Sequence, residues 1–174
     1  MSPRMTTYRI PGPWPGPLSI VLRPRGGDWL ADEVTAWQDS GIHTVVSLLT
    51  DDEATELDLA DEARVCHQHG IDLVAFPIPD RGVPESMATS ARVLGGLRTA
   101  LDASRHVAVH CRQGIGRSAL VTASLLVLAG AASDAAFTAV AAARGARVPD
   151  TPEQREWVRQ FARYLAGRRQ PVRV

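Results

Sequence analysis

The segment from His110 to Ser118 joins a cysteine to an arginine through a loop that contains two glycines. It reads His-Cys-Arg-Gln-Gly-Ile-Gly-Arg-Ser, between an apolar β-type run and a helix-forming run. A loop in that position directs several backbone N–H groups and a helix N-terminus towards one small bowl, which binds a tetrahedral oxyanion such as phosphate. The same positive dipoles favour the thiolate form of Cys111. A thiolate beneath a bound phosphate is a nucleophile directed at phosphorus.

The other loop residues suit phosphate binding. The planar fork of Arg117 can hold two phosphate oxygens at once and stabilise charge on the transferring group. Gly114 and Gly116 let the backbone turn its N–H groups inward and let phosphate approach closely. Three further residues are expected to contribute backbone N–H groups, with their side chains at the rim: Arg112, Gln113 and Ile115.

A leaving alkoxide or phenolate needs a proton from an acid on a movable loop. Asp80 stands in such a loop, Phe-Pro-Ile-Pro-Asp-Arg-Gly-Val-Pro, directly after a predicted strand. A turn-forming role would explain an aspartate in this context too. Its pairing with the cysteine loop favours the acid, with Glu85 as the next candidate and Asp51 or Asp52 as more distant ones.

The cysteine loop resembles the signature H-C-x5-R-S/T of the cysteine-dependent protein tyrosine phosphatase superfamily. The short chain and the surroundings of Asp80, 31 residues before Cys111, resemble its dual-specificity branch, and the resemblance spans roughly residues 15 to 166. It implies a phosphocysteine intermediate, a Ser118 hydroxyl that helps the sulfur leave, and a His110 that orients the loop through backbone hydrogen bonds.

The expected activity is therefore hydrolysis of phosphomonoesters, with a phosphorylated protein or a small phosphorylated molecule as substrate. Phosphotyrosine or dual-specificity protein phosphatase activity ranks first. Phosphatase activity on an inositol phosphate, phosphoinositide or nucleotide ranks second, because lipid-directed members often carry loop lysines and this chain has none. A non-catalytic phosphate-binding module is disfavoured because the cysteine, arginine and acid are all present. A rhodanese-like sulfurtransferase fits the Asp80 loop and the Arg-Ser ending less well.

The other cysteine, the histidine pair and several polar residues outside the loop are better explained by roles in the fold than by roles in catalysis. Cys66 lies in a predicted amphipathic helix, where an inert buried cysteine is common; the resemblance leaves a protective disulfide with Cys111 open. His67 and His69 lack further clustered ligands, so no metal or other cofactor is expected. Some tyrosine phosphatases place the hydrolytic water with a late glutamine, but a capping box with Thr151 explains Gln154 equally well. Arg144 and Arg147 are expected on the solvated surface.

Composition sets the broad class. The chain has 174 residues and a formal net charge of zero, with 19 basic and 19 acidic residues. This balance gives no general attraction to nucleic acid or membrane surfaces. The longest apolar run, residues 119–132, is too short to span a bilayer, and no signal-like segment begins the sequence. A cytoplasmic, reduced protein is expected, and a catalytic thiolate requires that environment.

Strands and helices are expected to alternate, which predicts one α/β domain with a central, mainly parallel sheet flanked by helices. The expected strands are 18–22, 43–49, 71–78 and 106–110. The expected helices are 29–40 (with Asp28 as cap and Gly41 at its end), 51–69, 86–104, 117–129, 133–144 and 151–166. Residues 1–17, rich in proline and glycine, are expected to be an extended segment that packs Trp14 locally. Residues 18–166 form the domain and 167–174 a tail. The active centre should lie at the carboxyl ends of the strands.

Overall fold

The computed structural model describes residues 5–169. They form five short strands and seven α-helices, with a 3-10 turn at Gly27–Trp29 before the first helix. The strands are β1 (Thr7–Ile10), β2 (Leu18–Val21), β3 (Thr44–Ser47), β4 (Asp72–Ala75) and β5 (Val107–His110). The helices are α1 (Leu30–Asp39), α2 (Asp51–Glu56), α3 (Glu62–Gln68), α4 (Met87–Asp102), α5 (Gly116–Leu128), α6 (Ser133–Arg144) and α7 (Pro152–Arg169).

The strands form one sheet in the order β1-β2-β5-β3-β4. Strands β2, β5, β3 and β4 are parallel to one another, and β1 pairs antiparallel with β2 at one edge. The expected α/β domain with a mainly parallel sheet is confirmed. Strand β5 occupies the middle of the sheet, so the residues after it lie at the centre of the sheet's carboxyl edge.

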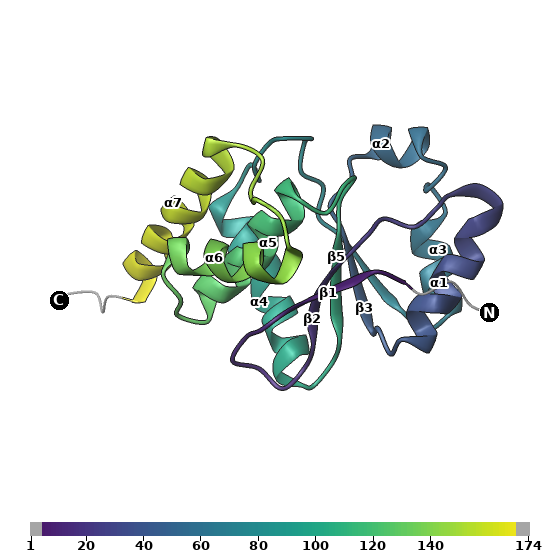
Figure 1. The fold of residues 1–174 in the computed structure, drawn as a ribbon, viewed down its shortest axis with the longest axis horizontal. Helices are drawn as coiled ribbons and strands as arrows, with labels where there is room; N and C mark the ends of the chain where they lie inside the picture. The colour runs from purple at the N-terminus through teal and green to yellow at the C-terminus, as the bar shows by residue number, and fades with distance from the viewer. Residues whose placement is uncertain (1–4, 170–174) are drawn as a thin grey trace.

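Helices cover both faces of the sheet. In Figure 1, α4, α5, α6 and α7 lie on one side, while α1 and α3 lie on the other. The buried residues form two hydrophobic clusters, one on each side. Alternate residues of β5 serve the two clusters: Val107 and Val109 belong to the larger one, and Ala108 belongs to the smaller one. This division follows from the opposite directions of successive side chains in a strand.

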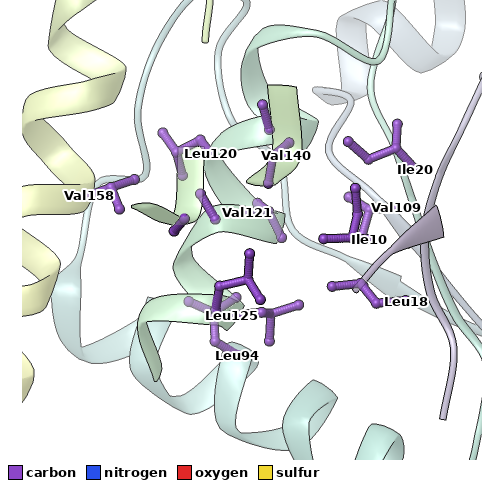
Figure 2. Close-up of a cluster of buried hydrophobic side chains, with 14 of the residues drawn as sticks. Ile10, Leu18, Ile20, Leu94, Val109, Leu120, Val121, Leu125, Val140 and Val158 are labelled. Carbon is purple, nitrogen blue, oxygen red and sulfur yellow. The ribbon is translucent and has the colours of Figure 1, made fainter. Parts of the chain in front are cut away.

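The larger cluster is built around α5, of which twelve residues are buried. Figure 2 shows Leu120, Val121 and Leu125 of α5 in the same apolar cluster as Ile20 of β2 and Val109 of β5. A helix with an apolar surface on nearly all sides must be covered on nearly all sides. Helices α4, α6 and α7 provide that cover, and the resulting rigid core supports the first residues of α5.

The structure corrects several expected elements. Residues 7–10 of the proline-rich segment form β1, an edge strand in which Tyr8 and Ile10 face the larger cluster. Helix α7 continues to Arg169, beyond the expected end at residue 166, and residues 170–174 of the expected tail lie outside the described part of the chain. Trp14 packs against the larger cluster, with the Arg98 guanidinium 5.6 Å from its ring centroid.

The single helix expected over 51–69 is wrong. The chain leaves the helical conformation after α2, reaches a positive φ of 54° at Asp58, and begins α3 at Glu62. Asp28 does not cap α1, because it lies inside the 3-10 turn and Trp29 takes the N-cap position without a side-chain hydrogen bond. Gly41, with φ of 74°, follows the end of α1 as expected.

Among the described residues, no helix has the length and apolar character needed to cross a membrane.

Candidate active site

Three loops meet at the carboxyl edge of the sheet. The loop after β5 carries Cys111, the loop after β3 leads into α2 with Glu53, and the loop after β4 carries Asp80. The three strands are parallel neighbours, so their carboxyl ends lie side by side. Sequence-distant residues are brought together in this way, and β5 places the cysteine loop in the middle.

Cys111 lies at the bottom of the loop and is 3% exposed. The backbone N–H of Gly114 donates a hydrogen bond to its Sγ at 3.2 Å. Gly114 adopts a φ of 69°, a left-handed conformation that glycine reaches without steric cost and that turns this N–H inward. This hydrogen bond fixes the position of the sulfur at the base of the loop. The loop ends at Gly116, where α5 begins.

Arg117 is buried, at 2% exposure, and its guanidinium forms a bidentate ion pair with Glu53. Nη1 and Nη2 donate to Oε2 at 2.7 Å and Oε1 at 2.9 Å, and Nη1 also donates to the carbonyl oxygen of Ile78 at 2.9 Å. Burial raises the pKa of Glu53, but the hydrogen bonds from Arg117 and the Thr50 N–H, together with the Arg117 charge, lower it overall. Glu53 therefore remains a carboxylate that holds Arg117 in place.

Asp80 lies on the rim of the loop and is exposed. Its Oδ1 accepts a hydrogen bond from Nη2 of Arg117 at 3.2 Å. The loop around it is anchored to α7, because Gln154 Nε2 donates to the Gly82 carbonyl at 3.1 Å and Trp157 Nε1 donates to the Pro84 carbonyl at 3.2 Å. An exposed carboxylate on an anchored loop, next to the buried arginine, is well placed to exchange protons with a ligand.

Two buried side chains support the loop from behind. Nε2 of His110 lies 2.6 Å from Oε1 of Glu62, and both side chains are almost fully buried. The His110 carbonyl also accepts a hydrogen bond from the Leu48 N–H at 3.0 Å. The hydroxyl of Ser118 is buried and has no hydrogen-bond partner among the described residues. The Ser118 hydroxyl, one residue beyond Arg117, is therefore a buried hydroxyl that no group of the described residues has yet engaged.

Arg144 holds the outer side of the loop. Its Nε donates to the Gly114 carbonyl at 2.9 Å and its Nη2 to the Gln113 carbonyl at 3.4 Å, while its guanidinium lies 4.0 Å from the ring centroid of Tyr8. These bonds tie the Gln113 and Gly114 carbonyls of the loop to α6. The expectation that Arg144 is a solvated surface residue is therefore wrong.

A cavity of about 180 Å³ opens above the loop. Residues 111–113 and 116–117 form its base and sides, and Asp80, Arg81 and Asp150 complete its wall. Arg112, at the rim, donates to both carboxylate oxygens of Glu56, at 3.3 and 3.0 Å. The cavity is smaller than the roughly 300 Å³ typical of the smallest drug-sized ligand sites, so it suits a phosphoryl group and the atoms next to it.

The remaining candidates lie away from this cavity. Neither Glu85 nor Asp51 nor Asp52 lines it. No group of three potential metal ligands occurs among the described residues. Gln154 forms the expected capping box with Thr151: the Gln154 N–H donates to Thr151 Oγ1 at 3.1 Å, and Gln154 Oε1 accepts from the Thr151 N–H at 3.2 Å.

Cys66 and Cys111 are both free and belong to different clusters. Burial, and secondarily the charge of Glu62, raises the pKa of the Cys66 thiol to about 12. Cys66 therefore carries a neutral, inert thiol, in agreement with its expected structural role.

Three residues of the site were not among the candidates that the sequence offered: Glu53, Glu62 and Asp150; Arg144 was named but placed on the solvated surface. Glu53 had a detectable signal, because Thr50 and Glu53 form a capping box, Thr-x-x-Glu, at the start of α2. The contacts of Glu62 and Arg144 depend on packing between distant elements, and no local pattern marks them. Asp150 directly precedes the Thr151–Gln154 box, which drew attention only to the glutamine.

The fold and the loop together define the cysteine-based protein tyrosine phosphatase superfamily and its dual-specificity branch. Residues 21–131, more than half of the chain, match the family described as "Polymorphic toxin system, DSP-PTPase phosphatase". The chain belongs to this family of phosphatases.

A curated relative agrees with that assignment, and solved structures agree with the fold. Cyclin-dependent kinase inhibitor 3 of Sus scrofa is 30% identical over 129 residues, which cover 73% of this chain and 60% of that protein. The chain spans 60–64% of the length of the curated relatives it matches. Kinase associated phosphatase, with its catalytic-site cysteine changed to serine, superposes with a TM-score of 0.85 at 21% identity, covering 95% of this chain and 98% of the other. PTPMT1 in complex with PI(5)P superposes with a TM-score of 0.71 at 18% identity, covering 87% and 94%.

Proposed function

We propose that this protein hydrolyses phosphomonoesters through a phosphocysteine intermediate on Cys111. The observation that carries the proposal is the convergence of three groups on one cavity. Cys111 lies at its base with an N–H group on its sulfur, Arg117 is fixed beside it by Glu53, and Asp80 stands at the rim in contact with Arg117. A nucleophile, a charge-stabilising cation and an acid in one cavity are the three components that phosphoryl transfer to cysteine requires.

Substrate binding rearranges the Arg117–Asp80 contact. The carboxylates of Glu53 and Asp80 and the carbonyls of Ile78 and Leu48 accept hydrogen bonds from Nη1 and Nη2, while the Nε–H has no partner among the described residues. A bound phosphate takes the Nε–H and competes with Asp80 for Nη2. Asp80 is thereby released from the cation and turns towards the leaving-group oxygen.

In the first step the Cys111 thiolate attacks phosphorus, the bond between phosphorus and the leaving oxygen breaks, and Asp80 donates its proton to that oxygen. The loop N–H groups and Arg117 stabilise charge on the equatorial oxygens. In the second step water attacks phosphorus, Asp80 accepts a proton from the water, and the phosphorus–sulfur bond breaks. The Ser118 hydroxyl, buried and unpaired, donates to the departing sulfur. Inorganic phosphate leaves and the thiolate is regenerated.

The preferred substrate in this proposal is a protein phosphomonoester, phosphotyrosine first. The small cavity admits one phosphoryl group, and carboxylates surround its arginines: Glu56 pairs with Arg112, and Glu53 and Asp80 pair with Arg117. A second phosphate on the substrate would meet these carboxylates. Because the chemistry needs a reduced cysteine, a cytoplasmic setting belongs to the same proposal.

The test measures phosphate release from four substrates: a phosphotyrosine peptide, a phosphoserine/threonine peptide, a phosphoinositide and an inositol polyphosphate. The Cys111→Ser protein serves as the blank and Cys66→Ser as the matched control. The proposal predicts release from the phosphotyrosine peptide by the wild-type and Cys66→Ser proteins, and none by Cys111→Ser, since a serine hydroxyl is a far weaker nucleophile than a thiolate.

Equal release by Cys111→Ser and wild type would refute the mechanism. Faster release from the phosphoinositide or the inositol polyphosphate would keep the mechanism and overturn the preference for a protein substrate. Binding of phosphate without release from any substrate, by a folded protein, would favour the phosphate-binding module.

A further inference from the structure

Arg81 lies on the wall of the phosphate cavity, directly after Asp80 in the chain. It is exposed, and no hydrogen bond or ion pair joins its guanidinium to any described residue. The other two arginines of the cavity, Arg112 and Arg117, are both paired with carboxylates of the protein. Among the described residues that line the cavity, Arg81 is therefore the arginine whose charge remains available to a ligand.

The backbone of Arg81 has a conformation that disfavours arginine. Arg81 is the third residue of a turn over residues 79–82, which a hydrogen bond of 2.8 Å from the Gly82 N–H to the Pro79 carbonyl closes. Its φ is 58°, in the left-handed region where a Cβ atom crowds the backbone. A turn with positive φ at its third residue favours glycine or asparagine there. The arginine is present despite this conformational cost, which indicates a role for its side chain.

Both ends of this turn are held in place. Before it, the Ile78 carbonyl accepts a hydrogen bond from Nη1 of Arg117 at 2.9 Å. After it, the Gly82 carbonyl accepts a hydrogen bond from Nε2 of Gln154 at 3.1 Å. The turn is thus anchored to the phosphate loop on one side and to α7 on the other, so the backbone of Arg81 is placed beside the cavity before a substrate arrives.

The position of Arg81 determines which part of a substrate it meets. In the proposed reaction the phosphoryl group lies at the base of the cavity with Cys111, and Asp80 serves the leaving-group oxygen above it. Arg81, the next residue on the wall, is placed beside the part of the substrate beyond that oxygen. A guanidinium there can bind a carboxylate through two parallel hydrogen bonds. A second phosphate is disfavoured, because the carboxylates of Asp80 and Asp150 in the same wall repel a dianion more strongly than a single charge.

We propose that Arg81 selects peptide substrates that carry an acidic residue next to the phosphorylated one, by pairing with its carboxylate; this role rests on the proposed function. The phosphorylated side chain enters the cavity, and the neighbouring aspartate or glutamate stays at the rim with Arg81. No bond forms or breaks at Arg81, so its contribution lies in the choice among substrates and not in the chemical steps.

Two phosphotyrosine peptides that differ only in charge measure this selection: one has glutamate on each side of the phosphotyrosine, and the other has glutamine. We expect kcat/KM of the wild type to be about 3- to 5-fold higher for the glutamate peptide, as for a partly exposed ion pair. The ratio of the two kcat/KM values should fall to about one in Arg81→Ala, and it should also fall as the salt concentration rises. Comparing two peptides within one variant cancels any general effect of the substitution on catalysis.

Arg92→Ala is the matched control, because Arg92 is an exposed arginine of α4 that does not line the cavity. It should keep the wild-type ratio. Arg81→Gly separates recognition from a role in the fold. Glycine adopts a positive φ without steric cost, so the melting temperature of this variant should equal or exceed that of the wild type while the ratio falls to about one.

A wild-type ratio at or below one, or an equal ratio in wild type and Arg81→Ala, would overturn the role of Arg81 and leave the proposed function intact. A marked fall in the melting temperature of Arg81→Gly would assign the arginine to the fold instead. Faster release from a bisphosphorylated than from a monophosphorylated phosphoinositide, lost in Arg81→Ala, would assign a second phosphate to Arg81 and overturn the acidic peptide. A wild-type protein that releases phosphate from none of these substrates would refute the proposed function, and this role with it.

Discussion

At the scale of single residues, the site depends on how one buried cation is neutralised. Arg117 is among the largest fully buried side chains, and Glu53 holds it with two short hydrogen bonds. Taking both charges out of water costs free energy that a bidentate pair only partly returns. We interpret this pair as a device for orientation: it keeps the guanidinium in the place where a phosphate must find it, before substrate arrives.

Changing Glu53 to glutamine tests this interpretation. We expect the free energy of unfolding to fall by about 2–3 kcal/mol, because the buried Arg117 loses a charged partner. Tungstate, an oxyanion that can pair with Arg117, should raise the melting temperature of Glu53→Gln more than that of the wild type. Thermal unfolding with and without tungstate measures both effects.

The control for this experiment is Glu56→Gln, which removes the exposed carboxylate that pairs with Arg112. It should leave the stability unchanged, since exposed ion pairs contribute little. The wild type should also lose stability as the pH falls below 4.5 through the lowered pKa of Glu53, whereas Glu53→Gln should lose less. Equal stability of Glu53→Gln and wild type throughout would contradict the role of this pair.

At the scale of elements, helix α3 forms the back of the site. It begins with Glu62, which binds His110, and carries Cys66 one turn later among the apolar residues that pack between the sheet and α1. The helix therefore carries a buried carboxylate, Glu62, and a buried thiol, Cys66. The thiol belongs to the smaller hydrophobic cluster, whereas Cys111 belongs to the larger cluster on the other side of the sheet. The thiol contributes to stability only while it is neutral.

Alkaline unfolding tests that statement. The unfolded chain releases the Cys66 proton near its ordinary pKa of 9.0, whereas the folded chain keeps it up to about 12. Between these values the folded state binds more protons, so the stability falls as the pH rises, by up to about 1.4 kcal/mol per pH unit. The chain has no lysine that would obscure this range. Denaturant unfolding at a series of pH values should show a shallower decline for Cys66→Ala than for the wild type; identical slopes would contradict the burial of a neutral thiol.

The elements also show what local sequence patterns can and cannot reveal. Each expected strand is present, because runs of β-branched apolar residues such as Val45 and Val46 have few alternatives to a buried strand. Strand β1 was missed because its pairing with β2 comes from tertiary contact rather than from pattern. The break between α2 and α3 was missed because an apolar periodicity continues through it, while Asp58 turns the chain. Cys111, Arg117 and Asp80 follow from motif and spacing, but their partners Glu53, Glu62 and Arg144 come from packing of distant elements.

At the scale of the whole molecule, the sheet separates two hydrophobic clusters that support the site in different ways. The side with α4 to α7 holds the large core, the start of α5 and the anchors of the Asp80 loop, while the other side holds α1, α3 and the support behind His110 (Figure 1). Strand β5 belongs to both sides and ends at the cysteine. Because packed helices lie on either side of it, Cys111 and Arg117 are placed by the fold rather than by the loop alone.

In the proposed reaction the phosphoryl group passes through Cys111. The most direct measurement is rapid acid quench of the wild-type protein during turnover of para-nitrophenyl phosphate, followed by peptide mass spectrometry. We predict a phosphoryl group on the Cys111 peptide and none on the Cys66 peptide. Sustained turnover with no phosphoryl group on Cys111, or with the group on another residue, would contradict the account.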